Sequence, residues 1–117
     1  MTQTKAIPTD YSPDWLERLD GRTRLAQVIN SRYHQLTTDL GGVDALSYQQ
    51  RSLCKRAIYL EAMLEQWETA LGKGEDVDSG KITNCLNSLL GVYRTLGLNR
   101  QTREVSLADV LNGSKGQ

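Results

Sequence analysis

The side chains best suited to nucleophilic or metal chemistry are one histidine, His34, and two cysteines, Cys54 and Cys85. A nucleophilic cysteine or serine needs an adjacent base, and neither cysteine has a histidine near it in the sequence. Zinc sites use closely spaced pairs of ligands, which one histidine and two separated thiols do not supply. We therefore expect no catalytic site, no metal site and no cofactor, and a protein that is not an enzyme.

Three carboxylates recur at positions i, i+4 and i+7 of one predicted helix, namely Glu61, Glu65 and Glu68. Buried carboxylates can transfer protons, whereas carboxylates on an exposed helix face are normally solvated. Two interpretations of this acidic stripe stay open. It is either an ordinary solvated surface or the contact surface of a small helical protein that binds another protein.

Basic residues are concentrated in the first half of the chain, although the formal net charge is zero. Residues 18–56 hold seven lysines and arginines against three acidic residues. A neutral total argues against strong nonspecific binding to polyanions, because that binding depends on releasing counterions through many positive charges. The basic block still allows a local anion-binding face.

A predicted helix over 22–40, a turn at Gly41 and Gly42, and a helix beginning at Ser47 together resemble a helix-turn-helix unit. In such a unit the first turns of the second helix reach base edges and phosphates. An ordinary solvated basic surface is the alternative interpretation. The DNA-binding hypothesis predicts contacts to double-stranded DNA from Tyr48, Gln49, Arg51, Ser52, Lys55, Arg56, Arg22 and Arg24.

Two apolar heptad repeats with 4-3-4-3 spacing are the clearest pattern in the chain, and this spacing is typical of helices that pack along a seam. The first repeat comprises Leu53, Ala57, Leu60, Leu64, Trp67 and Leu71, and the second Ile82, Leu86, Leu89, Tyr93 and Leu96. A turn rich in glycine and acidic residues joins them, so the sequence predicts an antiparallel helical hairpin. Whether the seams pair within one chain or between chains stays open. We expect self-association through Leu60, Leu64, Trp67, Leu71, Ile82, Leu86, Leu89 and Tyr93.

The predicted fold is all-α, a bundle of three main helices with a long antiparallel hairpin and two short terminal helices. The residues predicted to begin helices are Ser12 with Pro13, Ser47 with Gln50 as a capping box, and Asp78 or Ser79, and Gly97 is predicted to end one. Residues 1–11 are predicted to be a flexible tail, 12–111 a single helical domain with a last short helix at 106–111, and 112–117 a disordered tail. Gly91, inside the last main helix, is predicted to allow a close approach of two helices. No run of about 18 apolar residues and no signal-like N-terminus occur, so we expect a cytoplasmic protein.

A series of cap and seam residues along most of the chain resembles small phage- and prophage-associated proteins, including small subunits of the DNA-packaging terminase. These residues are Gly21-Arg22, Asp39-Leu40-Gly41-Gly42, Leu46-Ser47, Gln50-Arg51, Gly74-Glu75, Asp78, Asn87-Ser88-Leu89, Leu96-Gly97-Leu98, Arg100 and Arg103. The resemblance implies a protein that recognises viral DNA, assembles as a ring and delivers the DNA to a large motor subunit. Residues 100–111 would then be available to the motor, in the cytoplasm of the host cell.

The alternative function is a small helical adaptor or inhibitor of phage origin that binds another protein and does not bind DNA. The acidic stripe would then be its contact surface. Salt-sensitive binding to DNA distinguishes the two functions.

Overall fold

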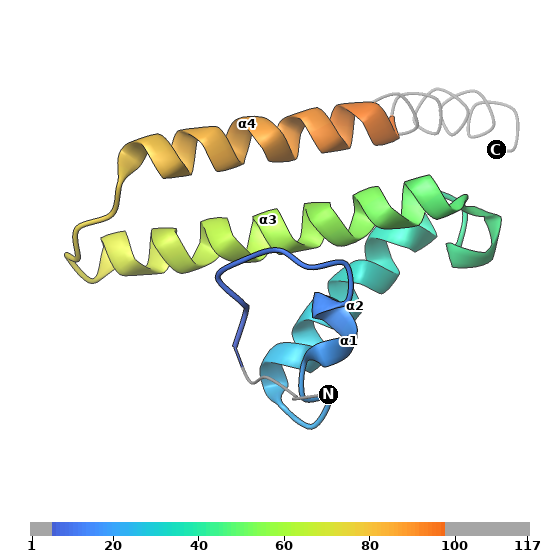
Figure 1. Ribbon diagram of the computed structural model, residues 1–117, viewed down its shortest axis with the longest axis horizontal. Helices are drawn as coiled ribbons and strands as arrows, with labels where there is room; N and C mark the ends of the chain where they lie inside the picture. The colour runs from blue at the N-terminus through green and yellow to red at the C-terminus, as the bar shows by residue number, and fades with distance from the viewer. Residues whose placement is uncertain (1–5, 98–117) are drawn as a thin grey trace, which may run out of the picture.

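The computed structural model describes residues 6–97, and it confirms the all-α fold (Figure 1). Three main helices, α2 (Arg24–Asp39), α3 (Tyr48–Gly72) and α4 (Ser79–Leu96), follow a short helix, α1 (Trp15–Arg18). One 3-10 turn, η1 (Val43–Ala45), connects α2 to α3, and residues 6–97 contain no β-strand. The predictions for residues 98–117, namely the motor-binding segment, the last short helix and the disordered tail, lie outside the described residues.

The predicted helix ends at α3 and α4 are confirmed. Ser47 and Gln50 form a capping box at the start of α3, in which the backbone N–H of Gln50 donates to Ser47 Oγ (3.1 Å) and that of Ser47 to Gln50 Oε1 (2.8 Å). Asp78 caps α4 by accepting from the Gly80 N–H. Gly97 ends α4 in the left-handed conformation (φ 81°), which costs glycine little.

The first two helices begin later than the sequence predicts. The short helix begins at Trp15 after Asp14, rather than at Pro13 after a Ser12 cap, and Asp14 makes no capping bond with its side chain. The second begins at Arg24, because Thr23 takes the cap position and its Oγ1 accepts from the Ala26 N–H.

The two heptad seams pair with each other inside one chain, as the adjacent antiparallel helices α3 and α4 (Figure 1). Near the middle of the hairpin, the Cys85 thiol donates to the Leu60 carbonyl (3.5 Å). Of the residues predicted for self-association, the intrachain core buries Leu64 and Leu89 and half-buries Leu60, Trp67, Ile82 and Tyr93. Leu71 and Leu86 stay exposed, and so does Leu90, which the heptad pattern does not include.

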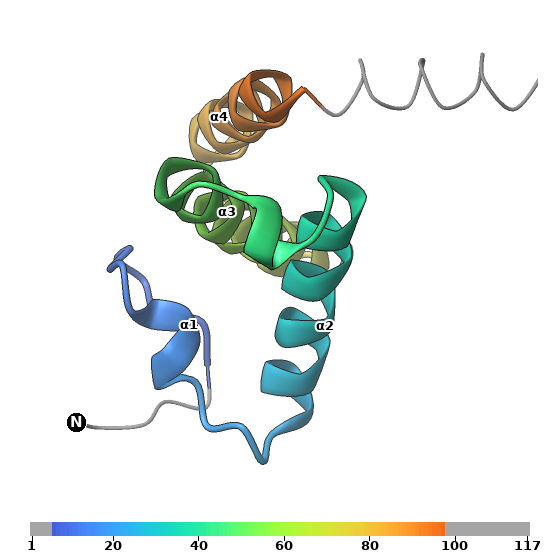
Figure 2. The same ribbon diagram turned by 90° about the vertical axis from the view of Figure 1, so that its right-hand side faces the viewer.

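The opposite side of α3 packs on α2, which crosses it steeply (Figure 2). The buried side chains here include Ile29 of α2 and Cys54 and Ile58 of α3. Both cysteines are free and buried, and burial raises the pKa of each thiol. The thiols are therefore in their protonated, weakly nucleophilic form at neutral pH.

Residues 6–11 lie against α3, which differs from the flexible tail predicted over residues 1–11. Ile7 is buried in the core, and the Tyr59 hydroxyl donates to the Pro8 carbonyl (2.8 Å). Tyr11 and the fully buried Trp15 each contact the Tyr59 ring edge-on, with ring centroids 5.4 Å apart. Residues 6–11 lack helical periodicity, but apolar burial and the bond to the Tyr59 hydroxyl, 51 residues along the chain from Pro8, hold them in place.

Glu61 of α3 connects all three main helices. Its Oε1 accepts from Arg32 Nη1 of α2 (3.1 Å), and its Oε2 accepts from the Tyr93 hydroxyl of α4 (2.8 Å). Arg32 also pairs with Glu65. The acidic stripe is therefore not wholly solvated, because two of its three carboxylates are bound to an arginine of the same chain.

No helix within residues 6–97 is both long and apolar enough to cross a bilayer.

Gly91 has a different environment from the one its sequence position predicts. A Cβ at this position would have no neighbour within 4 Å in the described part of the chain, so no other helix comes close to Gly91 there.

We expect Gly91→Ala to raise the free energy of unfolding by about 1 kcal/mol through helix propensity, and the midpoint of thermal unfolding by about 4 °C. The control Gly97→Ala should destabilise, because its φ of 81° strains alanine. Thermal unfolding followed by circular dichroism tests both, and a loss of stability in Gly91→Ala would contradict the open environment.

Tyr93 generates a prediction for the pH dependence of stability. Burial, together with the hydrogen bond to Glu61, raises the pKa of Tyr93 above its ordinary value. This contribution to stability is present below the unfolded pKa of about 10 and is lost as pH rises through the folded pKa. We expect Tyr93→Phe to lower the free energy of unfolding by about 1 kcal/mol at pH 8. The difference in free energy of unfolding between the variant and the wild type should narrow above pH 10, as measured by urea titrations. A difference that stays constant with pH would contradict the raised pKa of Tyr93.

Candidate nucleic-acid interface

One end of the molecule contains a cleft between the N-terminal segment with α1, the middle of α2 and the first half of α3. Figure 2 looks toward this end, with α1 and α2 on either side below α3. The cavity has a volume of about 330 Å³. We call it the N-terminal cleft, and its lining residues are Tyr11, Pro13, Leu16, Glu17, Asn30, Tyr33, Tyr48, Arg51, Ser52 and Lys55.

Half of the residues predicted to bind DNA lie in this cleft. Tyr48, Arg51, Ser52 and Lys55 all line it from α3. Their spacing of three, four and seven residues explains this, because such positions share one face of a helix. The structure therefore brings together the central part of the predicted DNA-binding set.

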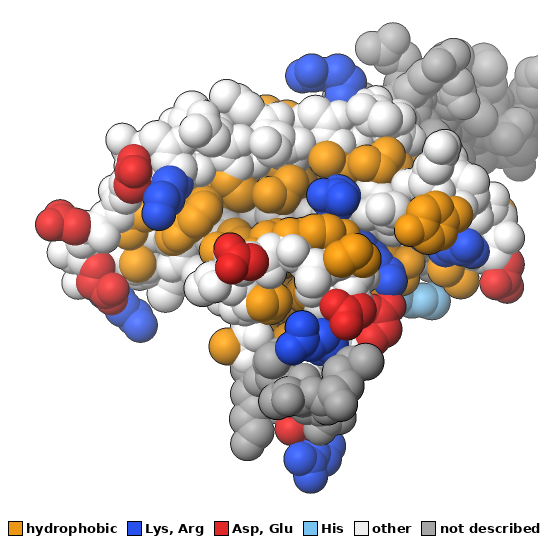
Figure 3. All heavy atoms as spheres, in the orientation of Figure 1, with side chains coloured by type: hydrophobic (Ala, Val, Ile, Leu, Met, Phe, Trp, Pro, Cys, Tyr) orange, Lys and Arg blue, Asp and Glu red, His pale blue; other side chains and the backbone are white. Residues whose placement is uncertain are grey.

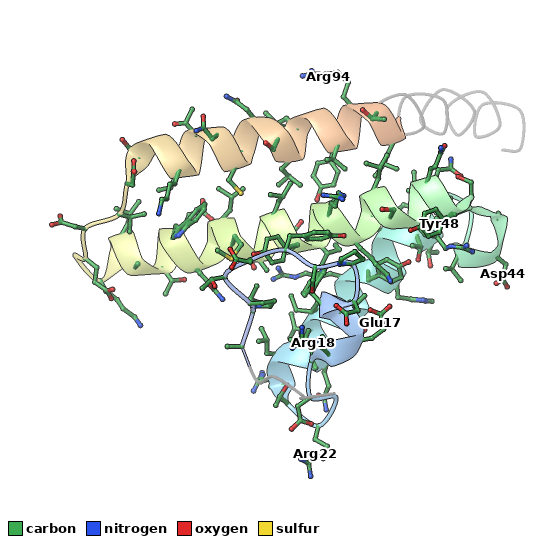
Figure 4. The ribbon with its side chains drawn as sticks, viewed as in Figure 1. Glu17, Arg18, Arg22, Asp44, Tyr48 and Arg94 are labelled. Carbon is green, nitrogen blue, oxygen red and sulfur yellow. The ribbon has the colours of Figure 1, made fainter. Side chains whose placement is uncertain are left out.

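The other predicted residues lie elsewhere. Gln49 is exposed outside the cleft lining, and the Arg56 guanidinium stacks over the Tyr11 ring, 4.4 Å from its centroid. Arg22 and Arg24 lie at the far end of α2, and Figure 4 shows Arg22 and Tyr48 at separate corners of the molecule. Arg22 and Arg24 instead line a separate cavity along α2, so they are not part of the cleft.

Arg22 also has an anionic partner of its own. Its guanidinium forms a fork with the carboxylate of buried Asp20, at 3.2 Å for both nitrogen–oxygen pairs. The hydrogen bond to Asp20 raises the pKa of Arg22. Arg22 therefore pairs locally at the turn before α2 and does not extend a continuous basic surface.

The two cations in the cleft differ in their partners. Lys55 Nζ contacts Glu17 Oε1 of α1 at 2.5 Å, and this hydrogen bond raises the pKa of Lys55. Arg51 forms no ion pair with any residue in the range 6–97. The cleft therefore holds one neutralised cation and one cation available to an external anion.

Aromatic rings form much of the remaining wall. Tyr33 of α2 is half-buried, and burial raises its pKa, so its hydroxyl stays protonated at neutral pH. Tyr48 at the first turn of α3 is 75% exposed. Tyr11 lies between the edge of Tyr59 and the Arg56 guanidinium. Rings beside an unpaired arginine are a surface on which planar, negatively charged ligands stack and pair.

Sequence reasoning missed the residues on the opposite walls. Tyr11, Glu17, Asn30 and Tyr33 come from three separate segments, and no spacing relates them to the start of α3. Only the crossing of α2 over α3 and the docking of residues 6–11 bring them there. A local sequence signal for them does not exist.

The side chains singled out for nucleophilic or metal chemistry do not line the cleft. His34 and both cysteines lie outside its lining, and residues 6–97 contain no cluster of three or more histidine, cysteine or acidic side chains that could hold a metal ion. Acidic and basic side chains are interspersed on the face drawn in Figure 3, so no broad basic surface extends across that face. Family models, curated proteins and solved structures give no match to this chain.

Proposed function

We propose that this protein is a DNA-binding subunit without enzymatic activity and that the cleft side of α3 contacts the DNA. The observation that supports this function best is the position of Arg51, an arginine without an ion-pair partner in residues 6–97 that lines a cleft beside Tyr48 and Lys55. The capping box already satisfies backbone donors at the start of α3, so anion binding here depends on side chains.

The more specific role is a phage DNA-packaging protein like the terminase small subunit, which recognises DNA as an oligomer and delivers it to a motor subunit. This part rests on the resemblance of the cap and seam residues. The exposed leucines of the hairpin support self-association, because Leu71, Leu86 and Leu90 remain 44–49% exposed after the seams pair internally. The motor contact is proposed for residues 100–111.

A helical adaptor or inhibitor of phage origin is the competing function. Its proposed contact surface is the acidic stripe, but two carboxylates of this stripe, Glu61 and Glu65, already pair with Arg32 of the same chain. We therefore prefer the DNA-binding function. Failure of DNA binding in the experiment below would favour the adaptor.

Arg51→Ala is expected to weaken binding to a labelled DNA duplex about tenfold in low salt, because one phosphate contact is lost. The slope of log K against log salt concentration should fall by about 0.9. Arg94→Ala is the matched control, because Arg94 is exposed on α4 and far from the cleft (Figure 4). Fluorescence anisotropy measures both, and equal effects of the two variants would contradict the proposed contact surface.

Glu17→Gln tests the same surface in the opposite direction. This change removes the carboxylate that pairs with Lys55 and leaves a side chain of the same size. We expect DNA affinity to rise about two- to fivefold, the range that corresponds to an exposed ion pair of up to about 1 kcal/mol. The same anisotropy titration measures it, and unchanged or weaker binding would show that Lys55 does not contact DNA.

Self-association is tested by Leu86→Glu combined with Leu90→Glu. Light scattering after gel filtration should give an oligomer for the wild type and a smaller mass for the double variant, because charges on the exposed seam oppose burial. Asn84→Glu on the same helix is the exposed control. A wild-type monomer would contradict the oligomeric part of the proposal.

A further inference from the structure

The N-terminal cleft is concave, whereas a helix that reads a duplex must project into the major groove. Tyr48, Arg51 and Lys55 are the α3 residues that such a helix would present. In this fold they form one wall of a cavity, and Glu17 of α1 reaches Lys55 from the opposite wall. These side chains therefore face a recess rather than a groove-sized open surface.

The size of the recess suits a small planar group. Its volume of about 330 Å³ is at the lower end of the range of cavities that hold small ligands. The paired and stacked bases of a duplex cannot enter such a cavity without unpairing. A single unpaired nucleotide combines a flat base with one phosphate charge and is small enough to enter.

The lining supplies both kinds of contact that single strands use, which are aromatic rings for stacking bases and cations for the backbone. Tyr33 forms a half-buried wall, and Tyr48 is an exposed ring at the rim. Arg51 lies beside them without an ion-pair partner in residues 6–97. Asn30 and Ser52 add polar groups to the same lining.

We propose that the N-terminal cleft binds one unpaired nucleotide of single-stranded DNA, with the base stacked on Tyr48 and Tyr33 and the phosphate held by Arg51. This inference rests on the proposed DNA-binding function and specifies the form of DNA that is recognised. Lys55 then leaves Glu17 and pairs with a phosphate of the strand, or it contacts the adjacent phosphate while its ion pair with Glu17 persists. The preferred substrate is a strand end, gap or unpaired region rather than an intact duplex.

The test compares two labelled probes on the full chain by fluorescence anisotropy. One is a 12-nucleotide single strand, and the other is a duplex of the same sequence whose two ends are closed by non-nucleotide linkers, so that it has no unpaired base. We expect the single strand to bind at least about tenfold more tightly, as loss or gain of one stacked base predicts. Tyr48→Ala should weaken single-strand binding about 5- to 100-fold and change duplex binding less than about twofold. Tyr48→Phe keeps the ring and should retain wild-type affinity.

Controls separate folding from binding. Tyr48 is exposed and alanine favours helices, so Tyr48→Ala should keep the helical circular dichroism of the wild type. Asn84→Ala removes an exposed side chain of α4 that does not line the cleft and should leave both affinities unchanged. Free dAMP in the same titration distinguishes a strand from a mononucleotide, and displacement at micromolar dAMP would overturn the assignment to a strand.

The remaining outcomes discriminate between this inference and the proposed function. Equal affinity for both probes, or a Tyr48→Ala variant that binds the single strand normally, would overturn the nucleotide cleft. Duplex binding that still depends on Arg51 would then leave the proposed function standing. Binding to neither probe in low salt would overturn both.

Discussion

The packing of α3 on three sides is the constraint on which the rest of this structure depends. One side carries the apolar seam against α4, a second packs on α2, and Tyr59 on a third holds residues 6–11. Glu61 joins two of these contacts in one carboxylate, because it accepts from Arg32 of α2 and from Tyr93 of α4. A rotation of α3 about its axis would break all of these contacts together, so its orientation is fixed.

That orientation also determines the form of the N-terminal cleft. When the seam faces α4, the face with Tyr48, Arg51 and Lys55 must turn toward α1 and α2. The four residues of α1 fill only part of the space beside α2, and Glu17 contacts Lys55 across what remains. The cleft is thus a consequence of burying a seam on the neighbouring face of the same helix.

Local signals made the helices and their ends largely predictable. The heptads from Leu53 to Leu96 predicted the hairpin, and the Ser47–Gln50 capping box and Gly97 predicted helix ends correctly. The partners of Glu61 were not predictable, because Arg32 and Tyr93 lie about 30 residues away on either side. The same limit applies to the candidate site. Spacing grouped Tyr48, Arg51, Ser52 and Lys55. The placement of Tyr33 depends on how α2 crosses α3, that of Tyr11 on how residues 6–11 dock, and Arg22 lines a separate cavity.

The bond between the Tyr59 hydroxyl and the Pro8 carbonyl has a consequence for the order of folding. It joins residues 51 positions apart, whereas the hairpin forms from contacts between neighbouring helices. Closing a long loop costs more entropy than closing a short one, so we expect residues 6–11 to dock after the helices have assembled. By the same reasoning they are among the first parts to detach in partial unfolding. The wall of the cleft that contains Tyr11 is then the last to be completed, and the recess opens widest in a molecule whose helical core is still intact.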